Sequence, residues 1–142
     1  MGHYTFLEDI ALADCAVEIG GRDLPDLFET AAVALASLMV DVGTVSITEH
    51  RHIVIESPSL DLLLYDWLSE LIFLKDRDRQ IFPATQVRIN GAGPFQLEAD
   101  ARGGFIDPKR TALGADPKAV TLHEFLLEKT EGGWRARLII DI

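Results

Sequence analysis

Apolar positions along the chain follow two periodicities, which predict strands and helices in alternation. Residues 14–19 alternate with a period of two, so that Cys15, Val17 and Ile19 share one side, as is typical of a half-buried strand. Runs rich in β-branched and aromatic residues predict further strands at residues 3–8, 52–56, 82–89, 95–101, 120–127 and 138–140.

Two longer segments, residues 24–40 and 60–74, have apolar residues at helical spacing. Asp23 is a suitable N-cap for the first helix, and Ser59 is suitable for the second. The second segment is apolar most of the way round, which predicts a helix that is covered on more than one side. Residues 75–80 are charged and are interpreted as a loop.

Two long helices and about seven strands, mostly joined as hairpins, indicate an α+β fold. We expect a single two-layer domain over residues 1–142, in which both helices pack on one face of a mostly antiparallel or mixed sheet. Residues 102–117 form a long irregular segment, and a loop of that length in a compact domain is often functional.

Composition limits the functions that the chain could have. Its net charge is −10, from 23 acidic and 13 basic residues, which argues against direct nucleic-acid binding. The charge favours a basic protein partner or a cation, although solubility alone explains it. Cys15 is the single cysteine and suits a reducing compartment. Without a signal-peptide pattern or an apolar run of roughly 20 residues, the protein is expected to be cytoplasmic and not membrane-bound.

The predicted last hairpin ends at Asp141 and Ile142, where two carboxylates would lie close together. These are the Asp141 side chain and the main-chain carboxylate of Ile142, and Asp14 opens another strand. If the two strands are neighbours, the three carboxylates could hold one calcium, magnesium or manganese ion. Alternatively, Asp141 is a solvated charge at a strand end.

The sequence gives less support to nucleophilic catalysis, phosphate binding and zinc binding. No serine has the context of a nucleophile elbow, and Gly103-Gly104 lacks the lysine of a phosphate loop. No cysteine–histidine cluster suits zinc. His123, in the last hairpin, could be a structural hydrogen-bonding group or a site residue.

Three motifs, in order and spacing, make the chain resemble the archease family over nearly its whole length. One is the tail, with residues 118–121, His123 and the ending Asp141-Ile142. The second is Leu-Leu-Tyr-Asp-Trp-Leu-Ser-Glu-Leu at residues 63–71, and the third is Ala-Asp at residues 13–14, ahead of the first predicted helix.

The resemblance implies a non-enzymatic accessory protein of the RtcB-type RNA ligase, which seals tRNA halves during splicing. Such a protein promotes guanylylation of the ligase, restores multiple turnover and broadens the use of nucleoside triphosphates. The family's cation site corresponds to Asp14, Asp141 and the carboxylate of Ile142, with calcium expected and magnesium or manganese as alternatives. Lys118 and His123 correspond to positions near that site.

Two departures from the family pattern concern histidines. Ala11 stands where the family has a histidine before Asp14, and Gly104 and Thr111 stand where the long loop has an acidic residue and a histidine.

Two other functions are kept as hypotheses. One is a small metal-dependent hydrolase, and the other is a chaperone-like protein-binding module that does not need Asp141.

Overall fold

Seven strands and two long helices account for most of the described residues, which are 2–11, 14–107 and 113–142 of a computed structural model. In chain order, the elements are β1 (His3–Ala11), β2 (Asp14–Gly21), α1 (Leu24–Met39), the short 3₁₀ helix η1 (Val42–Thr44), β3 (Glu49–Ser57), α2 (Leu60–Asp78), β4 (Gln80–Gly91), β5 (Phe95–Phe105), β6 (Ala119–Thr130) and β7 (Gly133–Asp141).

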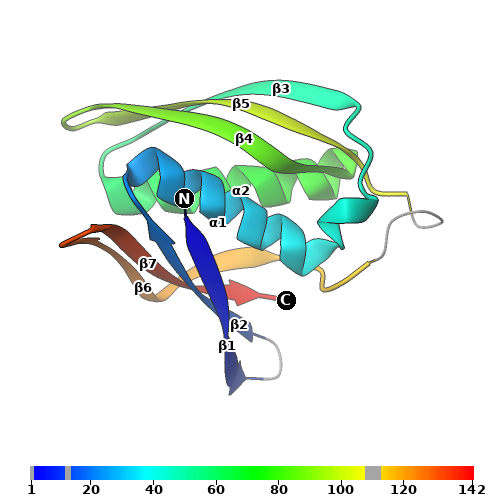
Figure 1. Ribbon diagram of the computed structural model, residues 1–142, viewed down its shortest axis with the longest axis horizontal. Coiled ribbons are helices and arrows are strands. Elements are labelled where there is room, and N and C mark those ends of the chain that lie inside the picture. The colour runs from blue at the N-terminus through cyan, green and yellow to red at the C-terminus, as the bar shows by residue number, and fades with distance from the viewer. Residues whose placement is uncertain (1, 12–13, 108–112) are drawn as a thin grey trace.

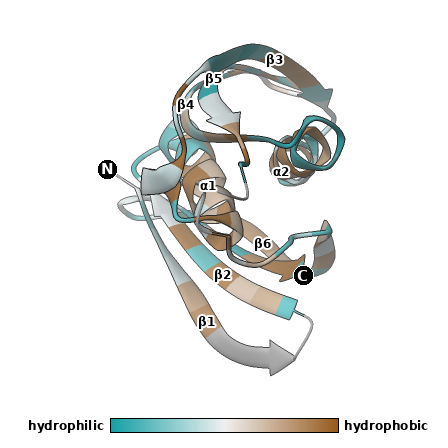
Figure 2. Ribbon diagram, turned by 90° about the vertical axis from the view of Figure 1, so that its right-hand side faces the viewer, coloured by the Kyte–Doolittle hydropathy of each residue, from teal (hydrophilic) through white to brown (hydrophobic). Residues whose placement is uncertain are grey.

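The strands form two antiparallel sheets, with α1 and α2 between them (Figures 1 and 2). One sheet has the order β1-β2-β7-β6, and the other has the order β3-β5-β4. The α+β class and the antiparallel pairing are confirmed, but the strands divide between two sheets where the sequence analysis expects one. Each helix contacts both sheets, because each has apolar residues on more than one side to bury.

Both predicted helix starts are confirmed by their caps. The Asp23 carboxylate accepts a hydrogen bond from the main-chain N–H of Asp26 at 2.8 Å, and the Ser59 hydroxyl accepts one from Leu62 at 3.3 Å. Between the helices, the fully buried indole of Trp67 donates from Nε1 to the main-chain oxygen of Phe28 at 3.0 Å. This bond joins α2 to α1 at the centre of the core.

Two predicted boundaries are wrong. Residues 75–78 are the last turn of α2 rather than a loop. The helix ends at Asp78 and is followed by its C-cap Arg79, whose φ of 56° is left-handed. Strand β5 continues to Phe105, so Gly103 and Gly104 lie in the sheet. A Cβ atom at Gly104 would lie 1.9 Å from the main-chain oxygen of Ser46, so close backbone packing requires glycine there.

In the part of the chain that the structure describes, no helix has the length and apolar content needed to span a membrane.

Replacing Trp67 with phenylalanine should lower the free energy of unfolding by about 1–3 kcal/mol, because the change removes a buried hydrogen bond and leaves a small cavity. Urea unfolding followed by circular dichroism measures the effect. Trp134→Phe, at a partly exposed position, is the matched control and should cost less. An equal loss in both variants would contradict a special role for the Trp67 bond.

Candidate metal centre

Asp14 and Asp141 lie directly opposite each other on neighbouring antiparallel strands. Strands β2 and β7 pair over their whole length, from Asp14 with Asp141 to Gly21 with Trp134. On the other side of β7, Ala119 of β6 pairs with Asp141, and the N–H of Lys118 donates to the Asp141 main-chain oxygen at 2.7 Å. The condition that the sequence analysis set, that these two strands be neighbours, is therefore met.

The apolar pattern decides which face of the sheet carries the two carboxylates. Val17 and Ile140 are buried in the core against the helices, and Ile142 packs against the same core. Since successive side chains in a strand point to opposite faces, Asp14 and Asp141 point away from the helices. Both are half-buried at that surface.

Two like charges in such a pair repel each other, because the Cβ atoms of directly opposite residues are roughly 5 Å apart. Neither Asp14 nor Asp141 has a hydrogen bond or ion pair through its side chain with any residue that the structure describes. A cation between the two carboxylates would offset this repulsion. An all-oxygen donor set suits calcium, magnesium or manganese better than zinc or copper.

The two aspartates do not make a complete metal cage from side chains alone. Within residues 2–11, 14–107 and 113–142, no three His, Cys, Asp or Glu side chains are grouped so as to hold a metal ion. The third predicted ligand is the main-chain carboxylate of Ile142. Because Ile142 directly follows Asp141, this carboxylate would lie next to the Asp14–Asp141 pair. The residues present therefore fit a surface cation bound by few protein ligands and completed by water or by a partner.

The two predicted neighbours of the site differ in their placement. Lys118 is exposed and immediately precedes Ala119, the residue that pairs with Asp141. His123 lies further along β6 in an irregular stretch, where residues 122–125 stand opposite the single residue Leu138 and Glu124 has a φ of 53°. His123 is exposed, and the strand register does not bring it into the row of Asp14 and Asp141.

The departures from the family pattern fall in different parts of the molecule. Ala11 pairs with Asp14 through the main chain at the end of the β1–β2 hairpin. Gly104 was assigned to the long loop, but it lies in β5 of the other sheet. Thr111 lies outside the described residues, as does Ala13.

Lys75 is a structural contributor that the sequence analysis missed, because it placed this lysine in a loop. The Lys75 side chain, at the end of α2, is only 7 % exposed. Its Nζ donates to the Asp116 carboxylate and, at 2.7 Å, to the main-chain oxygen of Pro117. These bonds anchor the segment that leads directly into Lys118 and β6. The signal available in the sequence was the helical spacing of Leu71 and Leu74, which continues to residue 75.

Comparisons with known proteins agree with this architecture. The sequence profile of the archease protein family matches residues 4–142. The chain belongs to the archease family. The predicted resemblance is thereby confirmed.

The alignments with relatives in this family cover almost the whole length of this chain and of each relative. Protein archease of Methanosarcina mazei is 36 % identical over 141 residues, which are 98 % of this chain and 95 % of that protein. Protein archease of Archaeoglobus fulgidus is 32 % identical over 98 % of each chain. The solution structure of Methanobacterium thermoautotrophicum protein 1598 is 30 % identical, with a TM-score of 0.80 over 98 % of each chain. The crystal structure of a Thermotoga maritima archease, described as a possible chaperone, has a TM-score of 0.64 at 20 % identity and covers 99 % of this chain and 100 % of that one.

In a buffer that contains a metal chelator, Asp14→Asn should raise the free energy of unfolding by on the order of 0.5 kcal/mol, because it removes a like-charge pair. Chemical unfolding of both proteins at pH 7 measures this difference. Glu18→Gln is the matched control, since Glu18 lies on the same strand and face but opposite Arg137. It should leave the stability unchanged or lower it. A destabilised Asp14→Asn protein would contradict the proposed repulsion.

Lys75→Met should lower the free energy of unfolding by about 1–3 kcal/mol at pH 7. The change removes the hydrogen bonds of a nearly buried ammonium group to Asp116 and Pro117, and its ion pair with Asp76 at 2.7 Å. Burial lowers the pKa of Lys75, but its bonds to Asp116 and Asp76 outweigh burial and leave the pKa raised. The hydrogen bond from Lys75 and its charge hold the pKa of Asp116 below its usual value.

The pH dependence of this effect follows from the lowered pKa of Asp116. The stabilisation is fully present above the ordinary carboxyl pKa of about 4 and is lost as the pH falls through the lower folded value. The difference between wild type and Lys75→Met should therefore shrink as the pH is lowered through the acid range below the ordinary carboxyl pKa. Lys129→Met, at an exposed site, is the control, and a difference that does not change with pH would contradict the contribution of the ion pair.

Proposed function

We propose that this archease-family protein is an accessory activator of an RtcB-type RNA ligase in tRNA splicing or RNA repair. It promotes guanylylation of the ligase, restores its turnover and broadens its use of nucleoside triphosphates. It acts through a divalent cation held by Asp14, Asp141 and the main-chain carboxylate of Ile142. Calcium is the first candidate ion, and magnesium and manganese are the alternatives.

The observation that carries this proposal is the cross-strand pair of Asp14 and Asp141, half-buried on the face of the sheet that points away from the helices. A carboxylate pair that has no cationic partner among the residues the structure describes, at the surface of a family member, is a suitable place for an ion that must meet another protein. Lys118 is exposed next to this pair, and its positive charge would help to attract phosphate groups.

A divalent ion bound at this pair would supply charge neutralisation and orientation for triphosphate oxygens. The chain itself contributes a rigid donor pair, because β2 and β7 are held in register by their full ladder and by the apolar residues beneath them. Hydrogen bonds from Lys75 hold Asp116 and Pro117, the two residues that lead into Lys118. The replacement of the family histidine by Ala11 leaves the ion dependent on carboxylate oxygens, which favours calcium or magnesium over softer metals.

Guanylylation of the purified cognate ligase, measured with labelled GTP, tests the proposal. Wild-type protein should increase the rate and the number of turnovers, and Asp14→Asn and Asp141→Asn should each lose most of this stimulation. Glu131→Gln, which removes a carboxylate from the exposed β6–β7 turn, is the control and should stimulate fully. If Asp14→Asn and Asp141→Asn both still stimulate the ligase fully, the proposed cation site is contradicted.

The metal requirement can be measured without the ligase. Isothermal titration with calcium, magnesium and manganese should show binding to wild type and about tenfold or greater weakening in Asp141→Asn, because one of few charged ligands is lost. Addition of one glycine after Ile142 moves the terminal carboxylate and should weaken binding in the same way. Unchanged binding in the extended protein would exclude that carboxylate as a ligand.

The same variants distinguish activation of a ligase from a chaperone-like function, such as the description of the Thermotoga maritima archease suggests for that protein. A protein-binding module of this kind would suppress aggregation of an unfolded client equally well with Asp141→Ala. Ligase activation would be lost in that variant.

A further inference from the structure

Strand β4 forms one edge of the three-stranded sheet, because it pairs with β5 on one side only (Figure 1). The β4–β5 register is regular from Ala84 to Gly91 and shifts between Ile81 and Ala84. Pro83 lies in the irregular stretch and has no N–H, so the part of the edge that could pair with another strand begins at Ala84. An unpaired edge of this kind is a template for strand addition, and folded proteins protect such edges.

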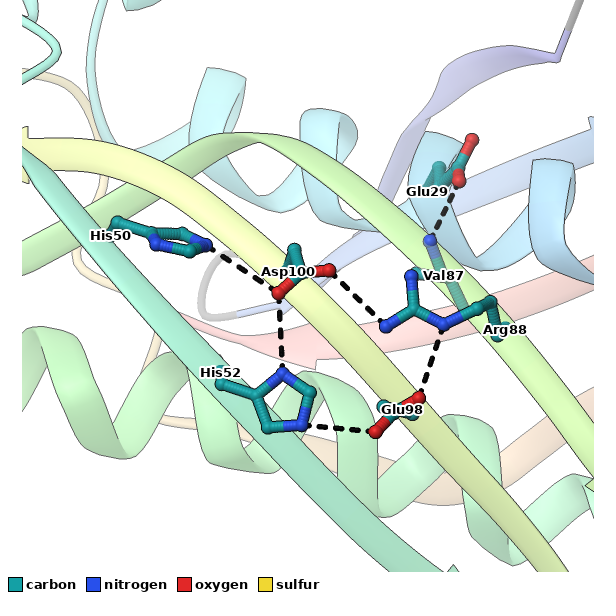
Figure 3. Close-up of polar contacts among 7 residues, drawn as sticks. All are labelled: Glu29, His50, His52, Val87, Arg88, Glu98 and Asp100. Carbon is teal, nitrogen blue, oxygen red and sulfur yellow. Dashed lines mark hydrogen bonds and ion pairs between the residues drawn. The ribbon is translucent and has the colours of Figure 1, made fainter.

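One main-chain group on this edge is occupied by a side chain from α1. The Glu29 carboxylate accepts a hydrogen bond from the main-chain N–H of Val87 at 2.8 Å (Figure 3). This N–H therefore points away from β5. Because main-chain groups alternate in direction along an antiparallel strand, the N–H and C=O groups of Thr85 and Ile89 point the same way. The bond to Glu29 thus falls near the middle of the regular stretch, with an outward-facing residue on either side.

The Glu29 side chain has no other bond that would explain its position. Among the residues that the structure describes, its only hydrogen bond or ion pair is the one to Val87. Glu29 is half-buried and is 58 residues away from Val87 in the sequence. A half-buried carboxylate is usually held by a cation, whereas this one is held by a neutral edge N–H. The contact with the strand edge is therefore what fixes this side chain.

Space beside the edge leaves room for another strand. A groove of about 730 Å³ lies next to β4 and is lined by Thr85 and Gln86 on the strand and by Glu29 and Val33 on α1, among others. A strand that pairs with an edge lies roughly 5 Å from it. Glu29 therefore crosses a gap that a second strand could enter.

A second copy of this chain suits this edge, because an antiparallel β4–β4 pair is self-complementary about a two-fold axis. With the axis at Val87, the two Val87 residues face each other, and Thr85 of one copy faces Ile89 of the other. On the outer face, Arg88 of one copy faces Gln86 of the other, so no like charges are directly opposite. Each Val87 N–H would donate across the axis, which it cannot do while it donates to α1.

We propose that Glu29 is an autoinhibitory contact, which occupies the β4 edge and keeps it from pairing with β4 of a second copy. The carboxylate takes the central N–H, and it places a negative charge where the second copy would bring an identical charge. Glu29 faces the three-stranded sheet, whereas Asp14 and Asp141 pair in the other sheet. The contact is therefore independent of the proposed cation site, and each can fail without the other.

Sedimentation velocity of the full chain over a range of concentrations tests the proposal, after circular dichroism has confirmed that each variant is folded. Glu29→Ala frees the Val87 N–H and should self-associate at least about tenfold more tightly than wild type, because both copies gain main-chain hydrogen bonds at the edge. Glu29→Met keeps the length of the side chain but removes the acceptor, and it should behave in the same way.

Glu29→Gln is the matched control, because its amide oxygen can still accept from the Val87 N–H. This variant should associate less tightly than Glu29→Ala. Glu131→Ala removes a carboxylate from the exposed β6–β7 turn and should behave like wild type.

The β4 edge itself is tested in the Glu29→Ala background. Ile89→Pro removes an outward N–H without a loss from the β5 ladder, and it should reverse the association. Ile89→Val keeps the N–H and should leave the association in place. In the associated protein, amide hydrogen exchange should slow at residues 85–89 as the concentration rises.

Two results would overturn the proposal. One is that Glu29→Ala and Glu29→Met keep the association state of wild type at every concentration. The other is that they associate but Ile89→Pro leaves the association unchanged, because another surface would then be responsible.

Discussion

The pairing of β2 with β7 is the constraint on which the rest of the structure depends. It joins a strand from near the beginning of the chain to its last strand, with every residue from Asp14 to Gly21 in register. The inward side chains of both strands complete the core beneath α1. The same ladder brings two carboxylates face to face on the outer surface. One set of hydrogen bonds thus stabilises the fold and creates the charge pair from which the functional proposal starts.

The three-layer arrangement explains why this pair can stay at the surface. Because both helices lie between the sheets, they cover the inner face of each sheet and not its outer face. A repulsive aspartate pair in the core would require a costly desolvation, whereas at a half-exposed sheet face water or a cation can reach it. The outer face of the other sheet is also polar, and its Glu98 and Asp100 carboxylates are contacted within the sheet by His50, His52 and Arg88. The two outer surfaces therefore differ in whether their negative charges are already paired.

The segment before β6 shows how the core supports the surface site. Lys75 extends from the end of α2 to Asp116 and Pro117, two residues that precede Lys118. The nearly buried ammonium thereby holds a stretch that has no regular secondary structure of its own. The hydrogen bonds of Lys75 stabilise the fold and also help to position the segment that pairs with Asp141. Stability and site geometry are therefore coupled through this one side chain.

Much of the local structure could be predicted from the sequence, because its causes lie within a few residues of each other. The caps Asp23 and Ser59, the alternation around Val17 and the α+β class all follow from local hydrogen bonding and periodicity. The candidate ligands Asp14 and Asp141 were identified by residue type and by family resemblance. Only the tertiary structure decided that their strands are neighbours and that the strands divide into two sheets. These features depend on which apolar faces are buried against each other between distant segments, and no local pattern in the chain specifies that choice.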